Sequence, residues 1–484
     1  MKGWFSAEER QRLSHHEGAV RDRINQIDKL LDQGFGTARD DLISERRTLV
    51  NELKGCFEHV MSENGLTDGY PHHMTIVVIA PNVSERMGGE AMKALRTYRA
   101  LKALRPNTSL ITHERNREEV KRLQLPDVTL VKDTPFSIFL WRTVLFRYLL
   151  DYWFAAKAVR LAMRTFRQER ETVIYQVEPN SPVLPRVVPE GFTNVLGPIN
   201  GNIYYPTMAR PAETLKTRLR RVFHFPAQRL NKVLFPSMAR ADLILTAGGE
   251  RTRSSLLARG CAPEILVDSI DCGIDDSLLD RPRIRHEGYN PRFVHFGRLV
   301  FHKCTFLIIE ALAKTSLPIQ LDVIGSGPEL SACKALTAQL KLGGRVIFKA
   351  PFARQSDLFD ALGEYRALIL PSIEDANGMV VQEAMAIGLP PVCLDWGGPR
   401  LLIQHQQTGY LIPPVSREQV TSEMADRLDQ LAQDDSIAEA FSVAGRERAQ
   451  AWRWSETAKE WVSHLERAAR TRELGQGEVP NYGS

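Results

Sequence analysis

Short apolar runs alternate with helical patterns throughout the second half of this sequence. The runs are RFVHF, IQLDVIG, RVIFKA, ALILPS and PPVCLDW, and each is long enough for one buried strand. Strands separated by helices of about 10 to 15 residues predict βαβ units and a parallel sheet. We therefore expect a Rossmann-like domain over residues 291–451.

A second sheet is predicted upstream of the first. MTIVVIAP (74–81) is rich in β-branched residues, as a strand buried on both faces should be. A glycine loop and a helix follow it, and further strand patterns begin near residues 110, 175, 195 and 245. These patterns predict a second Rossmann-like domain over residues 74–270, joined to the first by a turn-rich linker, 271–290. The expected fold class is α/β, with two parallel-sheet domains facing a cleft.

The two ends of the chain differ from the middle. Residues 1–73 predict a helical hairpin extension, because Ser6 and Glu9 form a capping box and GFG at 34–36 interrupts two helical patterns. We expect the hairpin to pack on the main body, and self-association through residues 1–70 is the alternative. The polar, glycine-containing segment 471–484 predicts a disordered tail.

Composition excludes several classes of protein. The six cysteines stand far apart with no Cys-x-x-Cys pair, so we expect neither a zinc site nor a disulfide framework. The first residues lack the apolar core of a signal peptide, and no run of about 18 uncharged apolar residues occurs. We expect a cytoplasmic protein, with attachment to the inner face of the cell membrane left open.

Positive charge gathers in two segments of the first half. Residues 136–170 hold seven basic residues against two acidic ones, and residues 209–240 hold eight against one. Such asymmetry indicates an anionic partner. We expect an anionic membrane surface and no nucleic acid. For the first segment, a helix packed on the sheet with a basic outer face is the alternative to a helix lying in the membrane interface.

The stretch PSIEDANGMVVQEAMAIGLP (371–390) places carboxylates on both sides of the start of a predicted helix, MVVQEAMAI. The N–H groups of Gly378, Met379 and Val380 have no helical partner, so this helix start can bind an anion. The side chain of Met379 is expected in the core. Asp375 and Glu383 would repel a phosphate and suit hydroxyl groups better. A nucleoside diphosphate sugar carries hydroxyl groups on both sides of its diphosphate, on the sugar and on the ribose.

The Asp375-x7-Glu383 spacing resembles the Glu-x7-Glu signature of the retaining glycosyltransferases of family 4, which have the GT-B fold. Three other segments resemble the same family: FGRLVFHKC (296–304), VIGSGPEL (323–330) and DWGGPRLLIQHQQTGYLI (395–412). The resemblance covers about residues 74–470. It implies that the helix over 452–470 returns to the N-terminal domain.

The resemblance also implies roles for individual residues. Arg298 and Lys303 should bind the donor diphosphate and remove the need for a metal or another cofactor. Asp375 should hold hydroxyls of the donor sugar, and Glu383 those of the ribose. The donor would be of the UDP or GDP type. The remaining residues expected at the donor are Gly88, Gly89, Gly297, Glu374, Asn377, Gly378, Met379 and Val380.

Two departures from the family pattern leave positions open. Asp375 replaces the usual Glu and has Glu374 beside it, so either carboxylate could reach the sugar. Many relatives carry a histidine in the N-terminal domain, where this chain has Tyr175 and Gln176, with Glu178 close by. Tyr175 and Glu178 are therefore candidates for contact with the acceptor.

The function implied is transfer of a hexose, with retention, from a nucleotide sugar to a hydroxyl of a glycan or a lipid-linked acceptor. Surface polysaccharide or glycolipid synthesis would be the setting. The rivals are an isomerase or phosphorylase on the same fold, and a catalytically degenerate sugar-binding or scaffold protein, because a fold alone does not fix chemistry.

Overall fold

A computed structural model describes residues 74–87, 89–143, 147–167, 171–201, 205–212 and 214–476. The described residues all belong to one compact unit. The helical hairpin predicted over 1–73 lies outside them.

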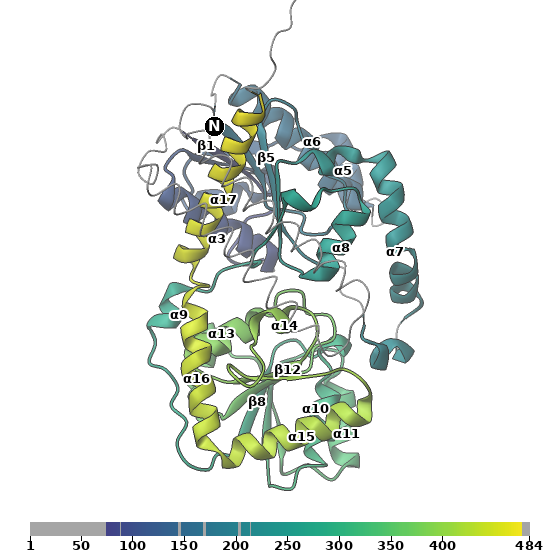
Figure 1. Cartoon of the computed structure of the whole chain (residues 1–484), viewed down its shortest axis with the longest axis vertical. Helices are drawn as coiled ribbons and strands as arrows, with labels where there is room; N and C mark the ends of the chain where they lie inside the picture. Colours follow the sequence, from purple (N-terminus) through teal and green to yellow (C-terminus); the bar gives the residue numbers. More distant parts are fainter. Residues whose placement is uncertain are drawn as a thin grey trace, which may run out of the picture. The chain divides into compact units, whose positions relative to one another are not determined.

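The first domain contains a parallel sheet, of which β1 and β5 are labelled in Figure 1. The sheet has seven strands in the order β3-β2-β1-β4-β5-β6-β7. Its strands are β1 Thr75–Ile79, β2 Thr108–His113, β3 Val128–Val131, β4 Thr172–Gln176, β5 Thr193–Ile199, β6 Leu243–Thr246 and β7 Leu266–Asp268. Every residue of β1 is buried. Helices cover both faces of this strand, which explains its continuous apolar sequence.

The helices of the first domain are α3 Gly89–Leu104, α4 Arg117–Arg122, α5 Pro135–Arg142, α6 Arg147–Thr165, α7 Leu215–Leu234 and α8 Glu250–Ala258. Ile76 and Val78 of β1 share a core with α3, whereas Val77 and Ile79 pack with Phe154 of α6 on the other face. Alternate residues of one strand thus enter two cores.

The second domain contains a six-stranded parallel sheet in the order β10-β9-β8-β11-β12-β13. Its strands are β8 Arg292–Phe296, β9 Gln320–Ile324, β10 Val346–Lys349, β11 Ala367–Leu370, β12 Pro391–Leu394 and β13 Tyr410–Ile412. Its helices are α9 Asp276–Asp280, α10 Thr305–Leu312, α11 Leu330–Gln339, α12 Gln355–Ala361, α13 Met379–Ile387, α14 Gly398–Leu402, α15 Arg417–Gln433 and α16 Asp435–Gln450. The core on one face includes α10 and α15, and the core on the other includes α13.

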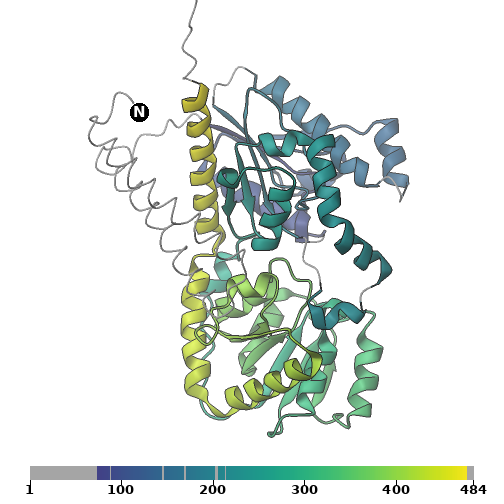
Figure 2. The ribbon, with the colours of Figure 1, turned by 45° about the vertical axis from the view of Figure 1, so that its right-hand side comes forward.

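The last helix, α17 Trp454–Gln476, packs on the first domain beside α3 (Figure 2). Trp461 of α17 is fully buried there and meets Tyr175 edge-on, with ring centroids 6.4 Å apart. The helix continues through Gln476, beyond the point where the disordered tail was predicted to start. Residues 477–484 lie outside the described part of the chain.

The two chain segments that cross between the domains pair with each other. Ile274 donates its N–H to the carbonyl of Trp452 at 2.7 Å, and Trp454 donates to the carbonyl of Ile274 at 3.1 Å. Gly273 leaves room for this pairing, because a Cβ there would lie 2.9 Å from the Trp454 backbone. The predicted linker, 271–290, is therefore partly structured, and it contains α9.

The strand order fixes where a ligand can bind. In open parallel sheets, ligands bind outside the carboxyl ends of the strands, at the point where the strand order reverses. That switch point lies between β1 and β4 in the first sheet and between β8 and β11 in the second. The predicted site segments follow these four strands.

Candidate active site

The loop after β11, residues 371–378, leads directly into α13, as the sequence indicated. We call it the donor loop, after the role that the sequence resemblance implies for it. Gly378 caps the helix at φ +72°, a left-handed conformation that favours glycine, and a Cβ there would press on Leu402 at 3.2 Å. The carbonyl of Gly378 accepts the N–H groups of Val381 and Gln382. The N–H groups that precede them have no carbonyl partner within the helix, so they remain available to a ligand.

The loop after β8 brings Lys303 to this place. Lys303 Nζ lies 2.5 Å from Asp375 Oδ2, and the two side chains are only 18% and 20% exposed. Arg298, on the same loop, is exposed, and its guanidinium has no hydrogen-bond or ion-pair partner among the described residues. The structure thus brings Lys303 and Asp375 together and leaves Arg298 open to solvent.

The glycine turn after β9 supports the loop that carries Arg298. Leu299 donates its N–H to the carbonyl of Ser326 at 2.9 Å, and a Cβ on Gly325 would lie 2.0 Å from the carbonyl oxygen of Gly297. Gly297 itself is exposed and has φ +136°. The segment GSGPEL therefore forms a tight turn that supports the loop carrying Arg298.

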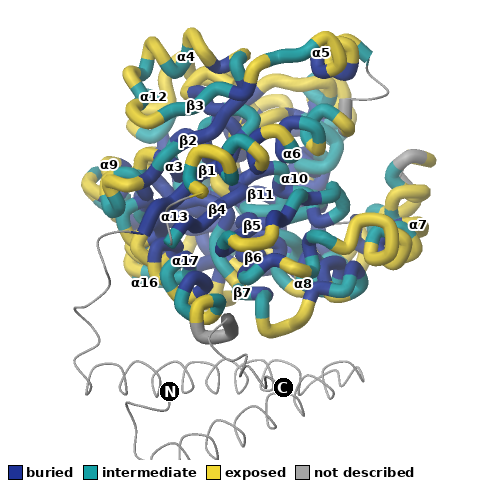
Figure 3. The backbone as a smooth tube through the Cα atoms, turned by 90° about the horizontal axis from the view of Figure 1, so that it is seen from above, coloured by how far each residue is buried: buried dark blue, intermediate teal, exposed yellow. Residues whose placement is uncertain are grey.

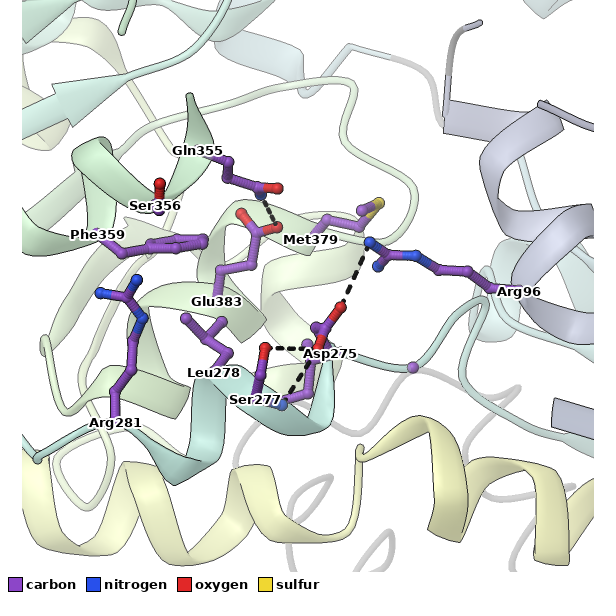
Figure 4. A pocket seen from close by; sticks show the side chains of 12 residues that line it. Arg96, Asp275, Ser277, Leu278, Arg281, Gln355, Ser356, Phe359, Met379 and Glu383 are labelled. Atoms are coloured by element: carbon purple, nitrogen blue, oxygen red, sulfur yellow. Dashed lines mark hydrogen bonds and ion pairs between the residues drawn. The ribbon is translucent and has the colours of Figure 1, made fainter. Parts of the chain in front are cut away.

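Glu383 lines a cavity of about 170 Å³, together with residues from both domains (Figure 4). Gln355 of α12 donates to Glu383 Oε1 at 2.9 Å. Arg96 of α3 approaches from the first domain, with Nη2 3.7 Å from Asp275 Oδ2. Met379, whose side chain was expected in the core, is instead partly exposed and lines the cavity, so that expectation was wrong.

The environment of Glu383 changes its acidity. Burial raises the pKa of this carboxyl to about 7, while the hydrogen bond from Gln355 and the charge of Arg96 act in the opposite direction. Glu383 therefore changes its charge near neutral pH. As a carboxylate it accepts hydrogen bonds with both oxygens, which suits a pair of hydroxyl groups.

Two residues of the donor loop bind other parts of the protein through their side chains. Glu374 Oε1 lies 2.6 Å from Arg220 Nη2 of α7, in the first domain. Asn377 Nδ2 donates to Cys272 Sγ at 3.0 Å and to Gln382 Oε1 at 3.3 Å. A ligand would therefore meet the backbone of Asn377.

The candidates in the first domain have different surroundings. Gly89 begins α3, and open space surrounds the position of a Cβ there, whereas Gly88 lies outside the described residues. Tyr175 is fully buried in the core against Trp461, so its side chain offers no surface to an acceptor. Glu178, just past β4, is 4% exposed, and its Oε1 has no hydrogen-bond partner among the described residues.

Glu178 lies in a buried polar environment. Burial raises its pKa to about 8, with Lys93 and Arg186 lowering it and Glu90 and Asp151 raising it. Its carboxyl group is therefore mostly neutral at pH 7 and can donate a hydrogen bond. This leaves Glu178 as the acceptor candidate that we retain.

Sequence reasoning missed Arg96, Asp275, Gln355 and Arg220. They lie far from the signature in the chain, and the fold brings them near it. Gln355 carried a weak signal, because it begins the helix that follows β10, at the carboxyl edge of the sheet. Among the described residues, no cluster of three or more His, Cys, Asp and Glu side chains is arranged to hold a metal ion.

Helix α7 is largely exposed (Figure 3), and its exposed side is apolar. Side chains three and four residues apart form an exposed stripe, which consists of Leu215, Leu219, Val222, Phe223, Leu230, Val233 and Leu234. The opposite face is polar and buried: His224 Nε2 and Gln228 Nε2 contact Ser255 Oγ at 2.8 and 2.7 Å. This is the reverse of an ordinary surface helix.

Across the described ranges, no helix is both long and apolar enough to cross a bilayer.

The other basic segment divides into two helices. α6 packs on the sheet through Phe154, Ala158 and Val159, in agreement with the alternative interpretation. α5 leaves Phe136 and Trp141 about half exposed. Exposed apolar side chains in the basic segments therefore belong mainly to α5 and α7.

Comparisons with known proteins show what this chain is similar to. Residues 277–448 match the family Glycosyl transferases group 1. The chain is 30% identical over 142 residues to N-acetyl-alpha-D-glucosaminyl L-malate synthase of Bacillus anthracis, a match that covers 29% of this chain and 35% of that relative. It is 27% identical over 245 residues to a GDP-mannose-dependent alpha-(1-6)-phosphatidylinositol monomannoside mannosyltransferase of Mycobacterium tuberculosis, covering 46% and 61%. The chain thus spans about a third of one relative and three fifths of the other.

Solved structures resemble the chain over a longer stretch. The apo form of lipopolysaccharide outer core galactosyltransferase WaaB aligns with a TM-score of 0.57 at 16% identity, over 83% of this chain and 100% of that one. Anabaena HepE in complex with UDP aligns with a TM-score of 0.54 at 17% identity, over 81% and 100%. The two parallel-sheet domains therefore form the predicted GT-B fold, and the match to the glycosyl transferases group 1 family falls within the second of them.

Proposed function

We propose that this protein is a retaining glycosyltransferase that moves a hexose from a nucleoside diphosphate sugar to a hydroxyl of a glycan or a lipid-linked acceptor. The Lys303–Asp375 pair beside the start of α13, at the switch point of the second sheet, carries this proposal. This site offers a cation and free backbone N–H groups that can bind phosphate, and a carboxylate that can accept hydrogen bonds from hydroxyl groups.

Each candidate residue has a role in the proposed reaction. Lys303 and Arg298 hold the diphosphate and stabilise the charge that grows on it as the bond to the sugar breaks. Asp375 accepts hydrogen bonds from sugar hydroxyls. Glu383 accepts those of the ribose, which places the nucleoside in the cavity that Glu383 lines. Glu178, at the switch point of the first sheet, donates a hydrogen bond to the acceptor.

A binding experiment can determine which nucleotide base the donor carries. The mycobacterial relative is named for GDP-mannose, and HepE is known in complex with UDP-glucose. We expect UDP or GDP to raise the melting temperature of the protein by roughly 2–5 °C at saturation. Glu383→Gln should reduce this shift, while Glu364→Gln, an exposed acid elsewhere in the same domain, should leave it unchanged. No shift with any nucleoside diphosphate would contradict the proposed donor site.

We expect transfer to proceed without a divalent metal. Arg298 and Lys303 supply the positive charge that a metal would otherwise bring to the diphosphate. Activity measured in a chelator should therefore stay within about twofold of the untreated rate, well short of the roughly tenfold loss that about 1.4 kcal/mol of barrier would produce. Strong inhibition that only added metal reverses would show that a metal takes part.

The exposed apolar stripe of α7 supports attachment to an anionic membrane, where a lipid-linked acceptor for surface polysaccharide or glycolipid synthesis would be found. Arg218 and Arg229 are exposed on the same helix. An anionic membrane has an apolar interior and negatively charged headgroups. It therefore matches both the exposed apolar stripe and the exposed arginines. The exposed aromatic residues of α5 would add shallow insertion.

Replacing Arg218 and Arg229 with Ser should weaken binding to phosphatidylglycerol vesicles by about 30-fold at low salt, since each basic residue contributes on the order of 1 kcal/mol. Arg220 is left unchanged in this test because it pairs with Glu374. The control is Lys334→Ser with Lys341→Asn, which removes the same charge from the second domain. Co-sedimentation measures the effect, and a wild-type protein that fails to bind such vesicles would contradict the membrane proposal.

A further inference from the structure

An ion pair joins α7 of the first domain to the donor loop of the second. Arg220 Nη2 lies 2.6 Å from Glu374 Oε1, and the two residues are 154 positions apart in the chain. Arg220 is not part of the exposed apolar stripe of α7. It lies four residues before His224, so the two side chains project from the same side of the helix, although Arg220 is itself exposed.

The donor loop carries two adjacent carboxylates, and each has its own cation. Lys303 from the second domain binds Asp375 at 2.5 Å, and Arg220 from the first domain binds Glu374. Without Arg220, the charge of Glu374 would repel a diphosphate at the start of α13 and would compete with Asp375 for Lys303. Arg220, the second cation at this loop, therefore neutralises a charge that would otherwise weaken binding of the diphosphate.

The rest of the loop is already fixed by short contacts. Gly398 donates its N–H to the carbonyl of Asp375 at 2.7 Å, and Asn377 donates to Cys272 Sγ at 3.0 Å. The side chains of Glu374 and Arg220 are 27% and 55% exposed, so their pair is open to water. A pair of this kind adds little to folding stability, and its removal should leave the fold intact.

We propose that Arg220 is a positioning residue for the donor loop, which neutralises Glu374 and so keeps Lys303 on Asp375 and on the donor diphosphate. The inference rests on the proposed function, because it takes the loop to be the place where the donor binds. It makes the affinity for the donor depend on a residue of α7, the helix with the exposed apolar stripe. Arg220 acts through Glu374 and need not touch the donor.

A charge-swap experiment tests this proposal. Arg220→Glu should raise the KM for the donor by about fivefold and leave kcat within about twofold, because it adds negative charge beside Glu374 and retains the groups at the reacting bond. Glu374→Arg removes the charge that repels the diphosphate, so this single variant should not raise KM. The double variant Arg220→Glu/Glu374→Arg should return KM to within about twofold of the wild type. Lys232→Glu makes the same charge reversal on α7, about 18 Å further along the helix, and should leave KM unchanged.

Amide hydrogen exchange gives a second readout that needs no activity. Peptides covering residues 371–378 should exchange faster in each single variant and return to the wild-type rate in the double variant, while the melting temperature stays constant. A double variant that restores neither KM nor the exchange rate would overturn the proposal. An Arg220→Glu variant whose KM is unchanged, as expected for Lys232→Glu, would overturn it too. If the wild type released no nucleotide from any donor, the proposed function would fail, and the exchange rates would still decide whether Arg220 positions the loop.

Discussion

Lys303→Ala should lower kcat/KM for transfer by roughly 30- to 1000-fold, which corresponds to a loss of about 2 to 4 kcal/mol of transition-state stabilisation. Lys303 is the cation held at the start of α13, where we place the diphosphate that leaves the sugar. The negative charge on that group grows as the reaction proceeds, so the loss should appear mainly in kcat. The fold should survive, because the side chain of Asp375 is 20% exposed to water even with Lys303 in place.

Lys314→Ala is a matched control for this variant. Lys314 also forms an ion pair within the second domain, to Glu418 at 2.7 Å. It follows the end of α10, whereas Lys303 precedes the start of that helix, so the two lysines lie at opposite ends of α10. The control should keep the wild-type rate. Equal activity of Lys303→Ala and the wild type at saturating donor would remove Lys303 from the proposed mechanism.

Glu383→Gln should lower kcat/KM by about 30-fold or more at pH 8 and should also flatten its pH dependence. Burial raises the pKa of Glu383 to about 7, above its ordinary value of 4.5. The carboxylate that accepts the ribose hydroxyls therefore forms as the pH rises through 7. In the wild type, the affinity for the donor should rise by about tenfold between about pH 6 and pH 8, as the ionised fraction grows.

The pH profile separates this explanation from a structural one. Glutamine retains the shape of the side chain and its contact with Gln355, and it has no charge to lose. A Glu383→Gln variant whose donor affinity still rose about tenfold over this range would show that another group titrates. Glu364→Gln, which leaves Glu383 in place, should preserve the wild-type profile.

The central strands were predictable from the sequence, because they are buried on both faces and form continuous apolar runs. The edge strands β3, β7 and β13, of three or four residues each, were missed. Runs that short, and partly exposed in β3, carry little periodic signal. The start of α13 was predicted at the correct residue, since Asn377 and Gly378 mark a turn and Gly388 ends the helix.

Less of the site than of the fold was predictable. The spacing of Asp375 and Glu383 is visible in the sequence, because both belong to one loop and the helix that follows it. Arg220 and Arg96 could not be found in this way, since each reaches this region from another domain. The positive charge of the segment that forms α7 was visible in the sequence, but the exposure of its apolar face was not, because that depends on what the opposite face packs against.

Release of nucleoside diphosphate from a panel of UDP- and GDP-sugars is the most direct test of the central claim. With a glycan or lipid-linked acceptor present, the wild-type protein should release nucleotide from at least one donor, and Lys303→Ala should release it at least about 30-fold more slowly. A folded wild-type protein that binds a donor but releases no nucleotide from any member of the panel would contradict the account, and would identify the chain as a sugar-binding protein built on an enzyme fold.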